Sequence, residues 1–140
     1  MQNTLSAIVQ KLQSRQFNAA AKQARAAYKK HPKQAAFAKF AGIALHELNK
    51  HAEAVKYLSR SLKMAPSDPS AQQYLVLSLL TLGQTEKAES ALLGWIKANP
   101  QDAELHYLLA SVYLRREDFL NAVKAASAAL NLRPNMNKAL

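Results

Sequence analysis

Four of the five prolines in this chain stand 34 residues apart, at Pro32, Pro66, Pro100 and Pro134. A second column with the same period holds alanine at every place, at Ala20, Ala54, Ala88 and Ala122. Two constant columns at one spacing indicate an internal repeat, and the period covers the whole chain of 140 residues. We therefore divide the sequence into repeats 1–34, 35–68, 69–102 and 103–136, and interpret 137–140 as the start of a further, truncated helix.

Each repeat contains two segments in which apolar residues recur at the spacing of an amphipathic helix. In the fourth repeat the first segment carries Leu105, Leu108, Leu109, Val112 and Tyr113, and the second carries Phe119, Ala122, Val123, Ala126 and Leu130. Polar stretches lie between the two segments, so each repeat is predicted to be a helical hairpin. The turn signals are Gly83 and the capping candidates Thr85 and Asp118, and the expected N-caps at repeat starts are Asp68 and Asp102.

The proline and alanine columns have different predicted roles. Each proline should end the second helix of its hairpin, because proline lacks an N–H donor and disfavours helical geometry in the preceding residue. Each alanine should lie where the two helices of a hairpin cross, since a small side chain lets their axes approach closely. One hairpin cannot cover its own apolar faces, so we expect an all-α protein whose four hairpins stack into a curved solenoid with a concave side.

The repeat resembles the tetratricopeptide repeat (TPR), a helical hairpin of 34 residues. In the second repeat the matching residues are Ala41, Gly42, Leu45, Ala54, Leu58 and Pro66, and in the fourth they are Ala110, Tyr113, Ala122, Ala129 and Pro134. The first repeat departs most, because Thr4 stands where the family often has tryptophan. The resemblance covers the whole chain and implies a single bacterial-type TPR domain over 1–140, a right-handed α-solenoid of four tandem helix-turn-helix hairpins.

In TPR proteins the first helix of each hairpin lines the concave face and binds an extended peptide or a helix of a partner protein. The resemblance therefore implies an apolar concave groove in this chain, which suits a ligand with apolar anchors. The alternative is that Phe40, Tyr74 and Tyr107 pack mainly between adjacent helices. Transferred position by position, the groove residues are Leu5, Val9, Lys39, Phe40, Ile43, His46, Gln73, Tyr74, Leu77, Tyr107, Ser111 and Arg115.

A subset of TPR proteins binds chaperone carboxylates through a clamp of basic residues and asparagine on this face. The matching positions here hold Leu5, Val9, Phe40, Ser70 and Tyr74. Because the clamp is absent from the sequence, the expected ligands are hydrophobic segments rather than chaperone C-termini.

The sequence contains no recognisable catalytic constellation. Without cysteine there is no thiolate nucleophile, disulfide or Cys-ligated zinc, and no Gly-rich phosphate loop or nucleophile elbow occurs. The four histidines, His31, His46, His51 and His106, are scattered along the chain, and the spacing between His46 and His51 does not place both on one helical face for a metal. We expect a non-catalytic segment with no cofactor and no metal site.

Positive charge is concentrated near the N-terminus of a chain whose net charge is +10. Residues 1–46 carry eight Lys or Arg and no acid, and five of these cations form a basic stripe: Lys22, Arg25, Lys29, Lys30 and Lys33. Three interpretations stay open, namely a solvated helix surface, a contact with an acidic protein, and binding of nucleic acid or lipid. The lack of interleaved aromatic residues disfavours nucleic acid.

Neither a secretory signal nor a membrane span is evident in the sequence. The N-terminus lacks a cationic start followed by an apolar core, and no stretch reaches the ~18 apolar residues that a span needs. These features predict a cytoplasmic protein. The last expected helix is rich in Ala and Leu, so we expect that the natural chain continues or that a homodimer forms through this C-terminal end.

These patterns leave more than one function open. The favoured function is a protein–protein interaction scaffold that binds a peptide or helix of a partner in an apolar concave groove. The alternative is an N-terminal docking module of a larger bacterial enzyme, such as a sulfotransferase or a glycosyltransferase. Binding of nucleic acid or an anionic surface through the basic N-terminal face rests on charge alone.

Overall fold

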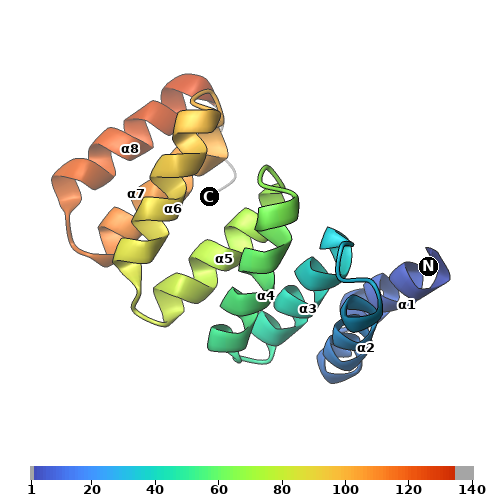
Figure 1. The fold of residues 1–140 in the computed structure, drawn as a ribbon. Coiled ribbons are helices and arrows are strands. Elements are labelled where there is room, and N and C mark those ends of the chain that lie inside the picture. The colour runs from blue at the N-terminus through green and yellow to red at the C-terminus, as the bar shows by residue number, and fades with distance from the viewer. Residues whose placement is uncertain (1, 135–140) are drawn as a thin grey trace. The chain divides into compact units, whose positions relative to one another are not determined.

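The computed structural model describes residues 2–134, which form eight helices and no strand (Figure 1). The prediction of an all-α protein is therefore confirmed, while the predicted helix start at 137–140 lies outside the described residues. The helices are α1 (Gln2–Gln13), α2 (Phe17–Lys30), α3 (Ala35–Glu47), α4 (His51–Met64), α5 (Pro69–Thr81), α6 (Thr85–Ala98), α7 (Ala103–Arg115) and α8 (Phe119–Leu132).

The chain divides into two compact units, one over residues 1–82 with α1 to α5 and one over 83–140 with α6 to α8. In the first unit α1 packs against α2 and α3 against α4, and the first helices α1, α3 and α5 contact one another in that order. In the second unit α7 packs against both α6 and α8. The pairs α1–α2, α3–α4 and α7–α8 thus form hairpins of the expected kind, visible as antiparallel pairs in Figure 1.

The proline column ends the second helices, as predicted. Helices α2, α4, α6 and α8 end two residues before a repeat proline, and the intervening residue is the C-cap. The C-caps His31, Ala65, Asn99 and Arg133 have ψ of 68°, 78°, 74° and 85°, well outside the helical range. The ring of the following proline disfavours helical geometry at this place, so the helix stops there.

The turns between helices also repeat, with a left-handed residue at the same place in all four. Gly83 has φ of 76°, and Arg15, Asn49 and Glu117 have φ of 62°, 62° and 59°. Only glycine adopts this conformation without strain, and asparagine tolerates it better than most other residues. The prediction of a turn at Gly83 is confirmed, and the same backbone geometry recurs where the sequence has no glycine.

Aspartate caps start three of the helices. Asp68 accepts hydrogen bonds from the backbone N–H groups of Ser70 and Ala71, and Asp102 accepts one from Glu104. Asp118 caps α8 through Asn121. The predicted cap at Thr85 is wrong: Thr85 is the first residue of α6, its N-cap is Gln84, and no side chain caps this end. A hydroxyl already inside the helix cannot receive the N–H bonds that an N-cap receives.

The alanine column is buried throughout, with exposed fractions of 0% at Ala20, Ala54 and Ala88 and 4% at Ala122. In the first unit a core cluster joins Ile8, Ala24, Ala27, Phe37 and Ala41. In the second unit Ala103 of α7 packs against Ala129 of α8. Small side chains therefore lie at the helix contacts, in agreement with the predicted close approach of the helix axes.

None of the helices within residues 2–134 combines the length and the apolar content that crossing a bilayer would require.

Candidate functional site

The predicted groove residues lie on the first helices of the hairpins. In the first unit they come from three helices, of which α3 contacts both α1 and α5, and we call this set the α1–α3–α5 face. The second unit contributes a separate set on α7, one helical turn apart. The α1–α3–α5 face consists of Leu5, Val9, Lys39, Phe40, Ile43, His46, Gln73, Tyr74 and Leu77, and the α7 set consists of Tyr107, Ser111 and Arg115.

Exposure varies over these residues. On the α1–α3–α5 face Gln73 and Leu77 are exposed, Leu77 at 37%, and the other seven side chains are half-buried. On α7 Arg115 is exposed, while Tyr107 and Ser111 are half-buried. A ligand on the α1–α3–α5 face would therefore meet the edges of packed apolar side chains and one more exposed leucine.

Lys39 and Phe40 are engaged within the fold. The Lys39 Nζ lies 3.0 Å from a carboxylate oxygen of Asp68 and 5.0 Å from the centroid of the Phe40 ring. Phe40 in turn packs against the core cluster of the first unit. The ammonium thus links α3 to the residue that caps α5, so the face is less cationic than the sequence indicates.

His46 is the centre of a polar and aromatic cluster between α3, α4 and α5. Its Nδ1 lies 2.7 Å from Ser78 Oγ, and its ring packs edge-on against Tyr74 with centroids 5.1 Å apart. His51 joins the same cluster: its Nδ1 lies 3.3 Å from Ser78 Oγ, and its ring centroid is 4.8 Å from that of His46. The two rings lie on different helices and share no helical face, as the spacing indicates, but the turn between α3 and α4 brings them into edge-on contact.

The surroundings change the protonation of two of these groups. Burial lowers the pKa of His46 below its ordinary 6.5, the neighbouring His51 lowers it further, and Glu47 opposes the shift. Burial, with a smaller contribution from Glu47, raises the pKa of Tyr74. Near neutral pH this part of the α1–α3–α5 face therefore carries neutral His46 and Tyr74 side chains.

On α7 the aromatic member also packs within its unit. Tyr107 packs against Ala103 and Ala129, and Ser111 Oγ donates a hydrogen bond of 3.3 Å to the Tyr107 carbonyl. Together with Phe40 and Tyr74, Tyr107 has much of its ring between helices, as the alternative interpretation expects. All three side chains nevertheless keep part of their surface accessible.

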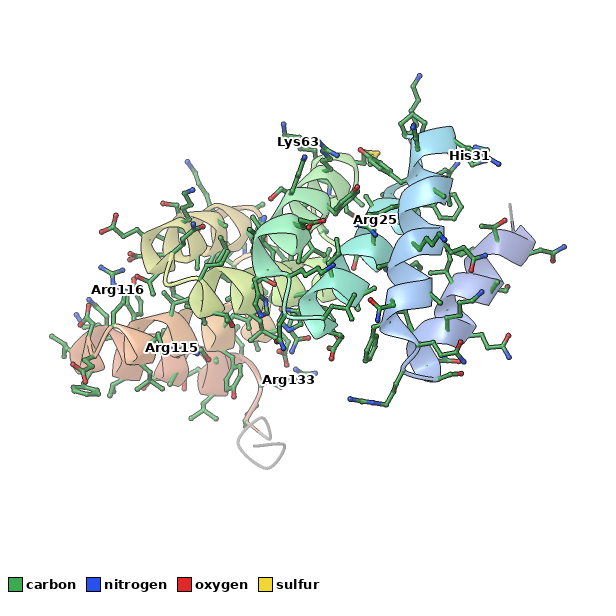
Figure 2. The ribbon with its side chains drawn as sticks, turned by 90° about the horizontal axis from the view of Figure 1, so that it is seen from below. Arg25, His31, Lys63, Arg115, Arg116 and Arg133 are labelled. Atoms are coloured by element: carbon green, nitrogen blue, oxygen red, sulfur yellow. The ribbon has the colours of Figure 1, made fainter. Side chains whose placement is uncertain are left out.

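The basic stripe lies along α2 and the turn after it. Arg25, shown partway along α2 in Figure 2, lies 3.4 Å from a carboxylate oxygen of Glu53 on α4. Within the described residues the four lysines Lys22, Lys29, Lys30 and Lys33 are exposed and form no ion pair. The structure thus separates one paired arginine from four solvated lysines.

One end of the basic stripe borders a pocket of about 260 Å³ between α1 and α2. Lys11 Nζ donates a hydrogen bond of 2.6 Å to Gln23 Oε1, which orients the Gln23 amide in its wall. His31 stands at the end of α2 beside it (Figure 2). The lining residues are Thr4, Gln23, Ala26, Ala27, Lys30 and His31.

Two residues of the His46 cluster were absent from the sequence-based site, His51 and Ser78. They lie 27 residues apart and on different helices, so no spacing within one helix could associate them. Among residues 2–134 no three His, Asp or Glu side chains are grouped in a way that could hold a metal ion.

Comparison with known families identifies the repeat. Three profiles, each described as tetratricopeptide repeat, match residues 10–69, 45–112 and 103–136, and together they span residues 10–136. The matches overlap across all four of the repeats that the proline column defines.

Solved structures with a similar fold include two bacterial-type repeat proteins. MamA from Desulfovibrio magneticus RS-1 superposes with a TM-score of 0.81 at 23% identity, over 98% of this chain and 77% of that one. YrrB, described as a TPR protein with an unusual peptide-binding site, superposes with a TM-score of 0.81 at 18% identity, over 98% of this chain and 73% of that one. At these identities the likeness concerns the fold.

Related sequences include parts of two larger proteins of Arabidopsis thaliana. Cell division cycle protein 27 homolog A is 27% identical over 109 residues, which are 78% of this chain and 15% of that protein. The TPR repeat-containing thioredoxin TTL4 is 30% identical over 84 residues, 60% of this chain and 12% of that protein. The chain thus spans less than a sixth of the length of either relative.

Proposed function

Because the chain belongs to the tetratricopeptide repeat family, whose modules mediate protein–protein interactions, we propose that it is a binding scaffold for an apolar segment of a partner protein. The proposed ligand is an extended peptide or a helix, and the proposed surface is the α1–α3–α5 face. The observation that carries the proposal is the state of this face at neutral pH, with accessible apolar edges and a neutral His46 and Tyr74.

The chemistry of the face supports an apolar ligand. Leu77 is 37% exposed on α5, and Val9 and Ile43 add half-buried aliphatic surface on α1 and α3. The one lysine of this face, Lys39, already pairs with Asp68 and so is a poor anchor for a ligand carboxylate. The described peptide-binding site of YrrB, a protein of the same fold, is consistent with peptide binding by this architecture.

Peptide display on the immobilised protein tests the proposal, followed by fluorescence polarisation with one enriched peptide. Leu77→Ser removes apolar surface at an accessible place, and Leu93→Ser is the matched control, since Leu93 is 48% exposed on α6. We expect Leu77→Ser to weaken binding by roughly 5- to 30-fold, the equivalent of about 1–2 kcal/mol of apolar contact, and Leu93→Ser to leave it unchanged. Failure to enrich any apolar peptide, or equal binding by both variants, would contradict the proposal.

A second candidate ligand is an acidic protein segment bound by the basic stripe. The four solvated lysines, which form no ion pair, support this candidate, together with the pocket beside Lys30 and His31. Replacing Lys22 and Lys29 with glutamate should abolish such binding, and raising the salt concentration should weaken the wild-type complex. Retention of the ligand by the double variant would exclude this candidate.

The role as a docking module of a larger enzyme is compatible with either ligand. The name of one relative joins TPR repeats to a thioredoxin, which supports this class of arrangement without indicating which enzyme, such as a sulfotransferase or a glycosyltransferase, would be involved here. Co-purification of the chain with an enzymatic activity from its source cells would support the docking role, and its purification without any would count against it.

Self-association through the C-terminal end is the remaining proposal. On α8 the side chains of Phe119, Leu120 and Val123 are 62%, 69% and 63% exposed, an apolar group that a second copy could cover. Analytical ultracentrifugation should then show a dimer that Val123→Glu dissociates. A strict monomer at all accessible concentrations would remove this proposal.

A further inference from the structure

Ser78 is shared by two histidines of different helices. Its side chain is fully buried on α5, at 0% exposed, and its hydroxyl oxygen lies 2.7 Å from His46 Nδ1 at the end of α3 and 3.3 Å from His51 Nδ1 at the start of α4. This one hydroxyl thus connects α5 to both helices of the preceding hairpin. We call these three residues the His–Ser–His cluster.

The hydrogen-bonding capacity of the cluster is limited. A hydroxyl has one hydrogen to donate, and a neutral imidazole has one N–H donor and one acceptor nitrogen. Ser78 can therefore donate to the Nδ1 of one ring while accepting from the Nδ1–H of the other, which satisfies all three groups. With both rings protonated each nitrogen is a donor, and the buried hydroxyl hydrogen must then find a different acceptor.

Two protons also place two positive charges close together. The ring centroids of His46 and His51 are 4.8 Å apart. His51 is the first residue of α4, where the free N–H groups of the helix already carry positive partial charge. Charges this close in a partly buried setting repel strongly, so the doubly protonated cluster is disfavoured in the folded state.

The other groups around the cluster do not remove this repulsion. On α3 the neighbouring Glu47 favours protonated His46, although burial and His51 outweigh it. In the turn, Lys50 adds a further cation as the N-cap of α4. On α5 Tyr74 packs on His46 and is neutral below its raised pKa, and on α4 Glu53 is already paired with Arg25 of α2.

We propose that the His–Ser–His cluster is a proton-responsive contact that holds α5 against α3 and α4 while at least one imidazole is neutral, and that releases α5 when both are protonated. The inference is independent of the proposed ligand, since it concerns the packing of the helices themselves. It would nevertheless alter the α1–α3–α5 face in acid, because α3 and α5 both contribute to that face.

The direction of the pH effect follows from the burial of His46. A histidine whose pKa in the folded state is below its ordinary 6.5 stabilises the fold fully above that pH. The stabilisation is lost as the pH falls through the folded pKa, because the unfolded chain takes up the proton more readily. Between pH 6.5 and the lower pKa that His46 has in the folded state, the folding equilibrium constant should fall by up to about tenfold per pH unit.

Titration of the imidazole signals of the wild-type protein by NMR is the first test. We expect His46 to titrate below pH 6.5, and its pKa to rise in His51→Asn, which keeps a side-chain donor near Ser78 but carries no titrating charge. The exposed His31 provides the control substitution, since His31→Asn should leave the titration of His46 unchanged. A wild-type His46 that titrates at or above 6.5, or that does not respond to His51→Asn, would overturn the proposal.

Hydrogen exchange of the wild-type protein tests the release of α5 and does not depend on any variant folding. As the pH falls from 7.5 to below the His46 pKa that the NMR titration gives, the protection factors of α5 amides, corrected for the intrinsic effect of pH, should fall more than those of α2. Equal loss in both helices, or no loss in α5, would show that the cluster does not act as a proton-responsive contact.

Discussion

A Cβ atom added at Gly42 would lie 2.5 Å from Cγ of Leu58 and 3.3 Å from the carbonyl oxygen of Ala54. Gly42 is on α3, and the other two residues are on α4, so the missing side chain is what allows this hairpin to close. Leu58 and Ala54 are both fully buried, and the backbone carbonyl cannot move independently of its helix. The crossing of α3 and α4 therefore tolerates no atom at this place.

Gly42→Ala should consequently destabilise the protein, although alanine is the better helix former. Forcing a methyl group into a packed core costs about 1–3 kcal/mol, which exceeds the gain of about 1 kcal/mol in helix propensity. Gly94→Ala is the matched control, because nothing lies within 4 Å of a Cβ at that exposed position of α6. Urea titration should show a lower free energy of unfolding for Gly42→Ala and a higher one for Gly94→Ala. The same sign for both would contradict the packing argument.

The helical hairpins could be predicted from the sequence because periodicity and helix-breaking residues act locally. The proline after each second helix and the aspartates Asp68, Asp102 and Asp118 operate through their own backbone and the next few residues, and all are found where predicted. The left-handed residues at Arg15 and Glu117 gave no local signal, because the turn between packed helices imposes that conformation on whichever residue is there.

The candidate site could be predicted less fully from the sequence, because it depends on contacts between helices. The position of Tyr74 on the first helix of its hairpin follows from the repeat, but its edge-on contact with His46 requires the packing of α3 against α5. Likewise, Lys39 reads as a free cation in the sequence and is paired with Asp68 in the structure. Spacing along one helix indicates which residues share a face, and not which partners they meet.

The left-handed turn residues predict a second pair of substitutions. Glu117 has φ of 59°, a conformation that is strained for a residue with a side chain and relaxed for glycine. Glu117→Gly should therefore raise the free energy of unfolding by about 1 kcal/mol, even though glycine in a helix would lower it. Gly83→Ala, the reciprocal change at φ of 76°, should lower it by a similar amount. Thermal denaturation of both variants measures the effect, and a loss of stability in Glu117→Gly would refute the assignment of strain.

A hydrogen-bonded carboxylate ties α6 to α7 and should make the second unit sensitive to acid. The hydroxyl of Tyr113 donates a hydrogen bond of 2.8 Å to Glu89, and Arg116 donates a further one to the same carboxylate. These two bonds lower the pKa of Glu89 below its ordinary 4.5, with the Tyr113 bond as the larger cause. A depressed pKa means that the carboxylate stabilises the fold above pH 4.5 and that this stabilisation is lost as the pH falls through the folded value.

Tyr113→Phe removes only the hydroxyl, so it should lower the free energy of unfolding at pH 7 by about 1 kcal/mol. The difference from the wild type should shrink as the pH falls below 4.5, because protonated Glu89 no longer gains from the bond. Glu89→Gln should remove the same pH dependence, whereas Glu117→Gln, at an exposed position, should retain it. Urea titrations between pH 3 and 7 measure this, and a difference that stays constant over this range would argue against the role of Glu89.

The uncapped start of α6 offers a final prediction. Gln84 occupies the N-cap of α6 with φ of −91° and ψ of 60°, close to the values of −89° and 77° at Asp118, the N-cap of α8. Asp118 accepts a hydrogen bond from a backbone N–H in the first turn, and Gln84 accepts none. The N-cap residues of α6 and α8 therefore have similar backbone geometry, but only the one of α8 carries a side chain that caps its helix.

Gln84→Asp should supply that cap and raise the free energy of unfolding by about 0.5–1 kcal/mol at pH 7. Part of the gain should come from the charge, because a carboxylate also interacts favourably with the positive end of the helix dipole. Gln84→Asn separates the two contributions, since asparagine caps without charge, and the aspartate variant should lose its advantage over it once the pH falls below about 4. If neither variant is more stable than the wild type in urea titrations, the geometry at residue 84 does not admit a cap.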